Sequence, residues 1–157
     1  MSQAIRFLTV DEVVAEQELQ LANYGGGNAG ILDYGKLNAA VGLPAATFGG
    51  EFLLDGIKGK ASGYLTYLVR DHVFEQANKR IGLAAALIFL AVNGLKVTAD
   101  NASVIDLVLT MASTGSEREE VEAFFDAHTE PCSAMALSEA SDWMHSVYAP
   151  AFRKLAE

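Results

Sequence analysis

The stretch from Ile81 to Val92 contains no polar side chain, and it constrains the fold of this chain more than any other feature. A helix that is apolar on every side must be enclosed by other elements. The stretch is too short to cross a bilayer as a helix, which takes about 20 residues. We therefore predict a central, buried helix from about Lys79 to Asn93, with Asn93 and Gly94 as its stop signal.

Elsewhere, apolar residues recur three and four positions apart, as in helices with one buried face. Strand signals are almost absent, so the sequence predicts an all-α fold. A length of 157 residues suits one small domain, residues 1–157, with one core around the central helix. Start and stop signals predict the other helices from Thr9 to Tyr24, Asp33 to Val41, Asp55 to near His72, Asn101 to a break at Thr114-Gly115, Ser116 to near His128, and Ser133 to Tyr148.

Local signals mark several of these helix ends. Thr9–Glu12 and Ser116–Glu119 have the spacing of capping boxes. Asp33 and Asp55 are the predicted N-caps of two further helices. Tyr24–Asn28, with three successive glycines, is predicted to stop the first helix. A phosphate-binding loop is the alternative for these glycines, but no strand precedes them, which favours a plain turn.

The net charge of −9 at pH 7 limits the partners of this chain. Nucleic acid and an anionic membrane surface both call for a basic face, so neither is expected to bind. Cys132 is the sole cysteine, which excludes an internal disulfide and favours a reducing compartment. Residues Met1–Arg6 show no apolar signal core, so we expect a cytoplasmic protein.

Groups capable of chemistry are concentrated in Asp71–Arg80, directly before the central helix. The free backbone N–H groups and the dipole at the start of a helix favour anions. Lys79 and Arg80 add two cationic side chains at this point, and His72 supplies a base nearby. The residues thus predict a phosphate-binding loop with a base beside it.

The segment His72–Arg80 reads His-x-Phe-x-Gln-Ala-Asn-Lys-Arg. It resembles the signature of the Fic/Doc family, and specifically the Doc-like, death-on-curing branch, in which the pattern is His-x-Phe-x-acid-Gly/Ala-Asn-Lys-Arg. Further similarity to that branch lies at Tyr24–Gly26, Gly30–Leu37 and Phe89–Gly94. The resemblance covers about residues 5 to 126.

This resemblance implies a Doc-like toxin of a toxin–antitoxin system, with a small helical fold. Such a toxin transfers phosphate from ATP, its substrate, to a hydroxyl group of a protein target such as elongation factor Tu, and thereby blocks translation. The implied partners are that translation factor and a Phd-like antitoxin protein.

The resemblance also assigns roles by position. His72 and Arg80 match the catalytic residues, with His72 as the general base. The nucleotide-binding positions are Phe74, Ala77, Asn78, Lys79 and Arg80. Among these, Asn78 is expected to hold a phosphate oxygen, Lys79 and Arg80 to neutralise phosphate charge, and Phe74 to anchor the loop.

Two positions favour the kinase-like branch over the branch that transfers AMP. Lys79 stands where adenylylating members have glycine, and Leu83 stands where they have a second arginine. One position departs from both branches, because Gln76 replaces the acidic residue that helps to hold Mg²⁺. A neutral amide is a weaker ligand for Mg²⁺ than a carboxylate. The alternatives are therefore an AMP transferase and a non-catalytic, Doc-like binding protein.

Residues 128–157 form a predicted C-terminal helical extension beyond the family core. Its apolar side chains are expected to pack on the chain's own core, and a homodimer face or a cover over the motif is the alternative. Pro150 is expected to kink or end its helix. His128, Cys132 and His145 lack metal-ligand or nucleophile partners at useful spacing, so structural or surface roles are expected.

Overall fold

The computed structural model describes residues 4–114 and 116–157. Gly115, half of one predicted helix break, lies outside the described residues. The all-α prediction is confirmed, and two small antiparallel strand pairs accompany the helices. The α-helices are α1 (Val10–Tyr24), α2 (Tyr34–Gly42), α3 (Gly56–Arg70), α4 (Asn78–Val92), α5 (Asn101–Thr114), α6 (Arg118–Ala127) and α7 (Leu137–Leu155). A short 3-10 helix, η1 (Leu43–Ala45), follows α2, and the strands are β1 (Thr47–Phe48), β2 (Glu51–Phe52), β3 (Leu95–Val97) and β4 (Thr129–Pro131).

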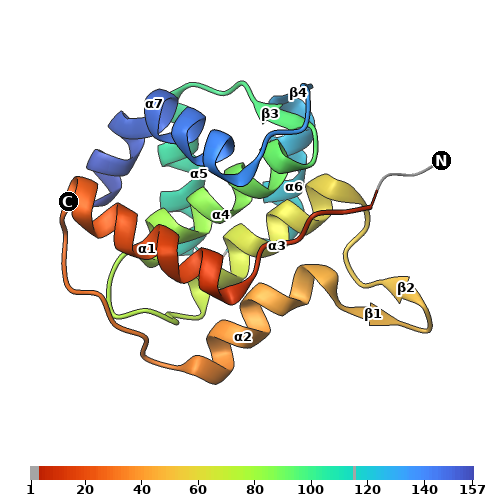
Figure 1. The fold of residues 1–157 in the computed structure, drawn as a ribbon, viewed down its shortest axis with the longest axis horizontal. Coiled ribbons are helices and arrows are strands. Elements are labelled where there is room, and N and C mark those ends of the chain that lie inside the picture. Colours follow the sequence, from red (N-terminus) through yellow and green to blue (C-terminus); the bar gives the residue numbers. More distant parts are fainter. Residues whose placement is uncertain (1–3, 115) are drawn as a thin grey trace.

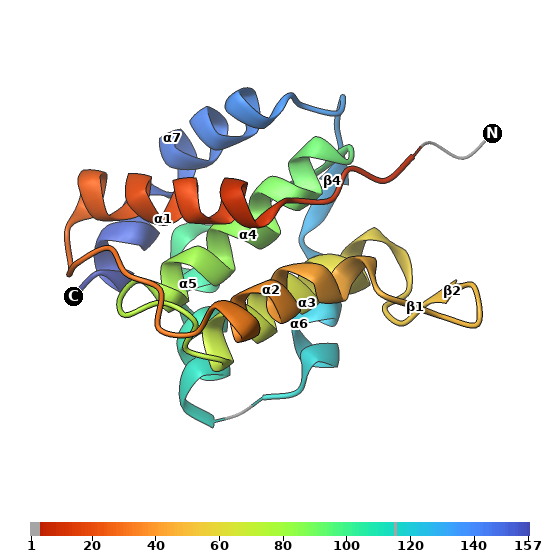
Figure 2. The same ribbon diagram turned by 60° about the horizontal axis from the view of Figure 1, so that its bottom comes forward.

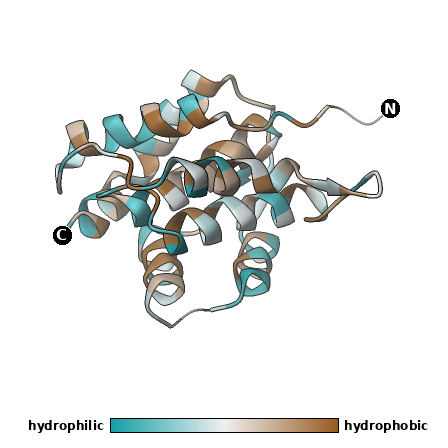
Figure 3. Ribbon diagram, turned by 90° about the horizontal axis from the view of Figure 1, so that it is seen from below, coloured by the Kyte–Doolittle hydropathy of each residue, from teal (hydrophilic) through white to brown (hydrophobic). Residues whose placement is uncertain are grey.

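Helix α4 is the centre of the fold, and every residue from Arg80 to Val92 is buried. Helices α1, α3, α5 and α7 all pack against it, so the prediction of an enclosed central helix is confirmed (Figure 1). Helix α2 lies over α3 on the outside of the bundle (Figure 2). The outer helices carry both hydrophilic and hydrophobic residues, as expected of helices with one buried face (Figure 3).

The predicted helix ends are mostly correct. Thr9 and Glu12 form the predicted capping box of α1, and the Asp33 side chain accepts from the Lys36 N–H at the start of α2. Asp55 holds the N-cap position of α3 as predicted, but its side chain makes no capping hydrogen bond. The second predicted capping box is wrong, because α6 begins at Arg118 with Glu117 as its N-cap.

Helix α7 begins at Leu137, later than predicted, and it continues through Pro150 to Leu155. Proline lacks the N–H that would continue the helical hydrogen bonds, and its ring crowds the preceding turn. The side chain of Asn101 enters the helix at this point: its Nδ2 donates to Val147 O at 3.1 Å, and its Oδ1 accepts from Ala151 N at 3.0 Å. These two bonds satisfy backbone groups beside the proline, so the helix is not ended there.

The apolar face of α7 packs on the chain's own core. Met144, Tyr148 and Phe152 are buried, and the helix contacts α1, α4 and α5. Strand β4, which precedes α7, pairs with β3 directly after α4. Within residues 4–114 and 116–157, every helix is too short or too polar to cross a membrane.

Candidate active site

The polar segment predicted to carry the chemistry forms the loop between α3 and α4, residues 71–77, which we call the motif loop. Its base is fixed to the core by Phe74, which is fully buried. Phe74 forms a β-bridge with Ile31, and Glu75 N donates to Gly30 O at 3.1 Å. Because Phe74 is enclosed, its side chain anchors the loop, and it does not line the pocket formed by the other predicted site residues.

Asn78, the first residue of α4, braces the motif loop from the other side. Its Oδ1 accepts from Phe74 N at 3.0 Å, and its Nδ2 donates to Phe74 O at 2.9 Å. This bracing role was missed in the sequence, where Asn78 is expected to hold a phosphate oxygen. One hydrogen of Nδ2 remains beyond the bond to Phe74, so direct phosphate binding by Asn78 stays a prediction.

Two residues of the loop have left-handed backbone conformations: His72 with φ of 48° and Ala77 with φ of 74°. Ala77 is the N-cap of α4 and makes no side-chain capping bond, so the first N–H groups of α4 have no partner within the helix. A non-glycine residue in this region costs on the order of 1 kcal/mol. Such strain is typical of functional loops whose surroundings hold them in place.

The motif loop, the start of α4 and the ends of α1 and α7 enclose a polar pocket of about 520 Å³, which we call the motif pocket. Most of the predicted site residues line it together: His72, Gln76, Ala77, Asn78, Lys79 and Arg80. His72 and Lys79 are exposed, so both are accessible to a ligand. Its other walls come from the end of α3 and from α5, and the contribution of α5 and of Leu155–Glu157 could not be read from the motif.

Arg80 is 2% exposed, so its guanidinium is held within the protein at the back of the pocket. Its Nη1 donates to Gln20 O at 3.1 Å and to Gly25 O at 2.7 Å. Burial lowers the pKa of Arg80 from its ordinary value, but a guanidinium remains charged in proteins. Both carbonyl partners come from the end of α1, which the motif alone does not reveal.

Two glycines allow the end of α1 to approach the motif closely. A β-carbon on Gly26 would lie 2.8 Å from Arg80 Nη2, and one on Gly27 would clash with the side chain of Gln76. Both glycines also have positive φ, 89° and 138°, which other residues rarely adopt. The glycine run is thus a turn, as predicted, and it also forms part of the motif pocket wall at Gly26.

The position expected to bind Mg²⁺ offers a poor donor set. Gln76 presents one neutral amide oxygen, and its aliphatic part packs on Gly27. The adjacent Glu75 also lines the motif pocket, and its carboxylate lies against Gly30. No group of three or more His, Cys, Asp or Glu side chains suited to a metal occurs in the described parts of the chain. Mg²⁺ is usually held by carboxylates, phosphates and water, so these residues do not fit a protein-built Mg²⁺ site.

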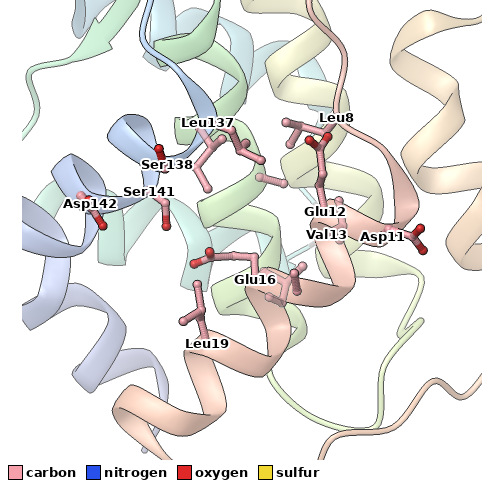
Figure 4. Close-up of a pocket in the computed structure, with 14 residues that line it drawn as sticks. Leu8, Asp11, Glu12, Val13, Glu16, Leu19, Leu137, Ser138, Ser141 and Asp142 are labelled. Carbon is pink, nitrogen blue, oxygen red and sulfur yellow. The ribbon is translucent and has the colours of Figure 1, made fainter.

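A second, apolar hollow of about 440 Å³ lies between α1 and α7, with α4 behind it (Figure 4). Leu8, Val13, Leu19 and Leu137 contribute to its lining, and the charged residues around it are all acidic. It contains no histidine, lysine or arginine among its lining residues. The groups that could transfer phosphate are therefore in the motif pocket.

The remaining candidates in the sequence lie away from the motif pocket. His128 packs on the ring of Phe124, with centroids 4.5 Å apart. Burial raises the pKa of the Cys132 thiol, which disfavours the nucleophilic thiolate. His145 makes two short hydrogen bonds that join α7 to α1, as described below.

A histidine, a lysine and an anchored arginine lie together around the start of a buried helix in a small helical domain, an arrangement suited to binding an anion such as phosphate. Residues 7–90 match the Fic/DOC family, which is more than half of the chain. The chain therefore belongs to the Fic/DOC family, as a Doc-like member.

Two relatives place it within that family. Over 109 residues it is 33% identical to the protein kinase doc of Escherichia phage P1, and the alignment covers 69% of this chain and 84% of the relative. Over 75 residues it is 41% identical to the toxin Doc of Mycolicibacterium smegmatis, covering 48% of this chain and 58% of the relative. Both similarities leave part of this chain unmatched.

Proposed function

We propose that this protein is a Doc-like toxin that transfers the γ-phosphoryl group of ATP to a hydroxyl group of a protein. The observation that carries the proposal is the anchoring of Arg80. Two backbone carbonyls hold Nη1, while Nη2 lies beside Gly26 on the pocket wall. A guanidinium fixed in this way can offer its other N–H groups to phosphate. Little further side-chain entropy is lost when the ligand binds, because the side chain is already ordered.

In the proposed reaction, the phosphates of ATP lie against the first turn of α4. The backbone N–H groups there, together with Lys79 and Arg80, balance the phosphate charge. The target hydroxyl oxygen attacks the γ-phosphorus, the bond from that phosphorus to the β,γ-bridging oxygen breaks, and ADP leaves. His72, exposed in the same pocket, accepts the hydroxyl proton.

The names of the two relatives support this choice of reaction and setting. One is called a protein kinase and the other a toxin. A toxin of this kind pairs with an antitoxin, so we propose an antitoxin protein as a partner. The resemblance of the motif to the Doc branch leads us to propose a translation factor, elongation factor Tu, as the target. The acidic balance of the chain, −9, suits a partner segment that is basic.

A second candidate function is favoured by Gln76. Its neutral amide stands where the family has an acidic metal ligand, so this chain is alternatively a Doc-like binding protein that has lost transfer. AMP transfer is a third candidate function, and the experiment described next must distinguish it from the other two. Mg²⁺, if required, would be held mainly by the ATP phosphates, because the residues around position 76 do not form a site for it.

Intact-mass spectrometry after incubation with ATP, Mg²⁺ and elongation factor Tu tests the proposal. We expect the factor to gain the mass of one phosphoryl group. A gain equal to one AMP would instead show nucleotidyl transfer. An unchanged mass, with the protein still binding the factor, would favour the non-catalytic binder.

A further inference from the structure

The two carbonyls that hold Arg80 belong to a part of α1 that is itself tied to α7. Gln20 O and Gly25 O are the acceptors for Arg80 Nη1. Gln20 also uses its side chain, because its Nε2 donates to Glu16 Oε1 at 3.1 Å. Gly25 directly follows Tyr24, the last residue of α1. Both anchors of Arg80 are therefore next to side chains that face α7.

Glu16 and Tyr24 are both hydrogen-bonded to the same histidine of α7, His145. His145 Nε2 lies 2.7 Å from Glu16 Oε1, and His145 Nδ1 lies 2.7 Å from the hydroxyl oxygen of Tyr24. A carboxylate can only accept, so Nε2 donates to Glu16, and Nδ1 of the neutral ring accepts from Tyr24. The same ring stacks on Tyr24 with centroids 5.7 Å apart.

This network is well enclosed. The side chains of His145 and Glu16 are 16% and 8% exposed, and Figure 4 shows Glu16 reaching from α1 toward α7. Phe152 packs against both Tyr24 and His145. Hydrogen bonds shielded in this way are costly to leave unmade, so the network fixes the relative position of the two helices.

We propose that His145 is a positioning residue for Arg80. It fixes the C-terminal part of α1 through Glu16 and Tyr24, and this part of the chain, with Gly25 after it, holds the guanidinium proposed to receive phosphate. The inference rests on the proposed function for its ligand, ATP. It concerns α7, which lies outside the residues that match the family, 7–90.

Substitutions at His145 separate positioning from packing. His145→Ala removes both bonds to α1. His145→Gln retains them in principle, since the amide can donate to Glu16 and accept from Tyr24. The matched control is Asn101→Ala, which also removes two hydrogen bonds to α7, but these bonds join α7 to α5 and not to α1. Asn101 has no place in the motif pocket.

The first measurement uses the nucleotide-free protein. Rotation of the Arg80 guanidinium about its Nε–Cζ bond is followed by ¹⁵N NMR, with the signal assigned by Arg80→Lys. We expect faster rotation in His145→Ala than in the parent, and parent-like rotation in His145→Gln and Asn101→Ala. Equal rotation in His145→Ala and the parent would overturn the proposal.

The second measurement is the affinity for ATP, by titration calorimetry. We expect His145→Ala to bind ATP about threefold to tenfold more weakly than Asn101→Ala. The comparison applies when the two substitutions lower the melting temperature by a similar amount. An equal loss of affinity in these two variants would also overturn the proposal. If the parent binds no ATP, the proposed function fails, and the NMR result alone decides the positioning role.

Discussion

Asn78 and Phe74 are joined by a closed pair of hydrogen bonds, in which the Asn78 amide accepts from Phe74 N at 3.0 Å and donates to Phe74 O at 2.9 Å. The Asn78 side chain thereby satisfies both the backbone N–H and the backbone C=O of Phe74, a residue of the motif loop. This pair fixes the motif loop to the first turn of the buried helix. His72 lies in the same loop, two residues before Phe74.

Asn78→Ala is expected to destabilise the protein by about 1–3 kcal/mol, because it leaves two backbone groups of the buried residue Phe74 without partners. The free energy of unfolding in urea measures this loss. Asn38→Ala is the matched control: Asn38 is exposed and makes one bond to Tyr34 O, so its loss is expected to stay within about 0.5 kcal/mol. Equal losses in the two variants would contradict the bracing role.

Ala77→Gly is expected to stabilise the protein by roughly 0.5 kcal/mol. Ala77 has φ of 74°, a conformation in which glycine carries no β-carbon strain, and part of this gain is offset by the freer unfolded chain. Ala39→Gly, in an ordinary helical position of α2, should instead destabilise by about 1 kcal/mol. Changes of opposite sign in the free energy of unfolding of the two variants, measured by chemical denaturation, would identify Ala77 as strained. A decrease in stability for Ala77→Gly would argue against strain.

The central helix could be predicted from sequence because its signal is local and unbroken. Residues 81–92 are apolar on every side, and the observed helix differs from the predicted one by one residue at each end. The motif residues His72 and Lys79 were likewise found from their spacing, and both line one pocket. Such features depend on near neighbours in the chain, so local rules describe them well.

Other features depend on residues that lie far apart in the sequence. Arg80 is held by carbonyls of Gln20 and Gly25, and no pattern around the motif indicates that contact. The continuation of α7 past Pro150 depends on Asn101, which supplies bonds from another helix. A local rule that proline ends a helix fails when a distant side chain satisfies the backbone.

His72→Ala is expected to abolish the growth arrest caused by expression of this protein while leaving its stability within about 0.5 kcal/mol. The side chain is exposed, so its removal costs little packing, whereas the proposed reaction loses its base. His128→Ala provides the matched control, since His128 lies outside the motif pocket. Comparable toxicity of His72→Ala and the parent at equal expression would rule out the assignment.

Stability at acid pH is expected to depend on Glu12. The hydrogen bond from Arg6 lowers the pKa of Glu12 from 4.5 to about 2, and the Thr9 N–H also contributes. A folded pKa below the unfolded one means that the stabilisation is present above about pH 4.5 and is lost as the pH falls toward 2. Because Arg6 is 41% exposed, we expect only about 1 kcal/mol at pH 7.

Urea denaturation of Glu12→Gln and the parent at several pH values measures this contribution. The difference between them should shrink by more than about half between pH 7 and pH 3. Glu18→Gln serves as control, because Glu18 is an exposed residue of the same helix. A pH-independent difference between Glu12→Gln and the parent would exclude the ion pair as its source.

Gln76→Glu is expected to raise the Mg²⁺-dependent rate of phosphate transfer. The substitution replaces a neutral oxygen by a charged one at the same reach, and a hard cation prefers the carboxylate. Glutamate is a better choice than aspartate here, because the aliphatic part of Gln76 packs on Gly27, and Glu keeps this part unchanged. We expect an increase of several-fold at limiting Mg²⁺ that diminishes as Mg²⁺ becomes saturating.

The matched control is Glu75→Gln, which removes the neighbouring carboxylate. Glu75 lines the motif pocket too, but its carboxylate lies against Gly30, so its loss is expected to change the Mg²⁺ dependence less than Gln76→Glu does. Transfer rates at varied Mg²⁺ concentration and fixed ATP distinguish the two positions. If Gln76→Glu changes neither the rate nor the Mg²⁺ concentration at half-maximal rate, residue 76 is not a metal position in this chain. In that case the neutral residue fits a site in which Lys79, Arg80 and the start of α4 carry the phosphate charge.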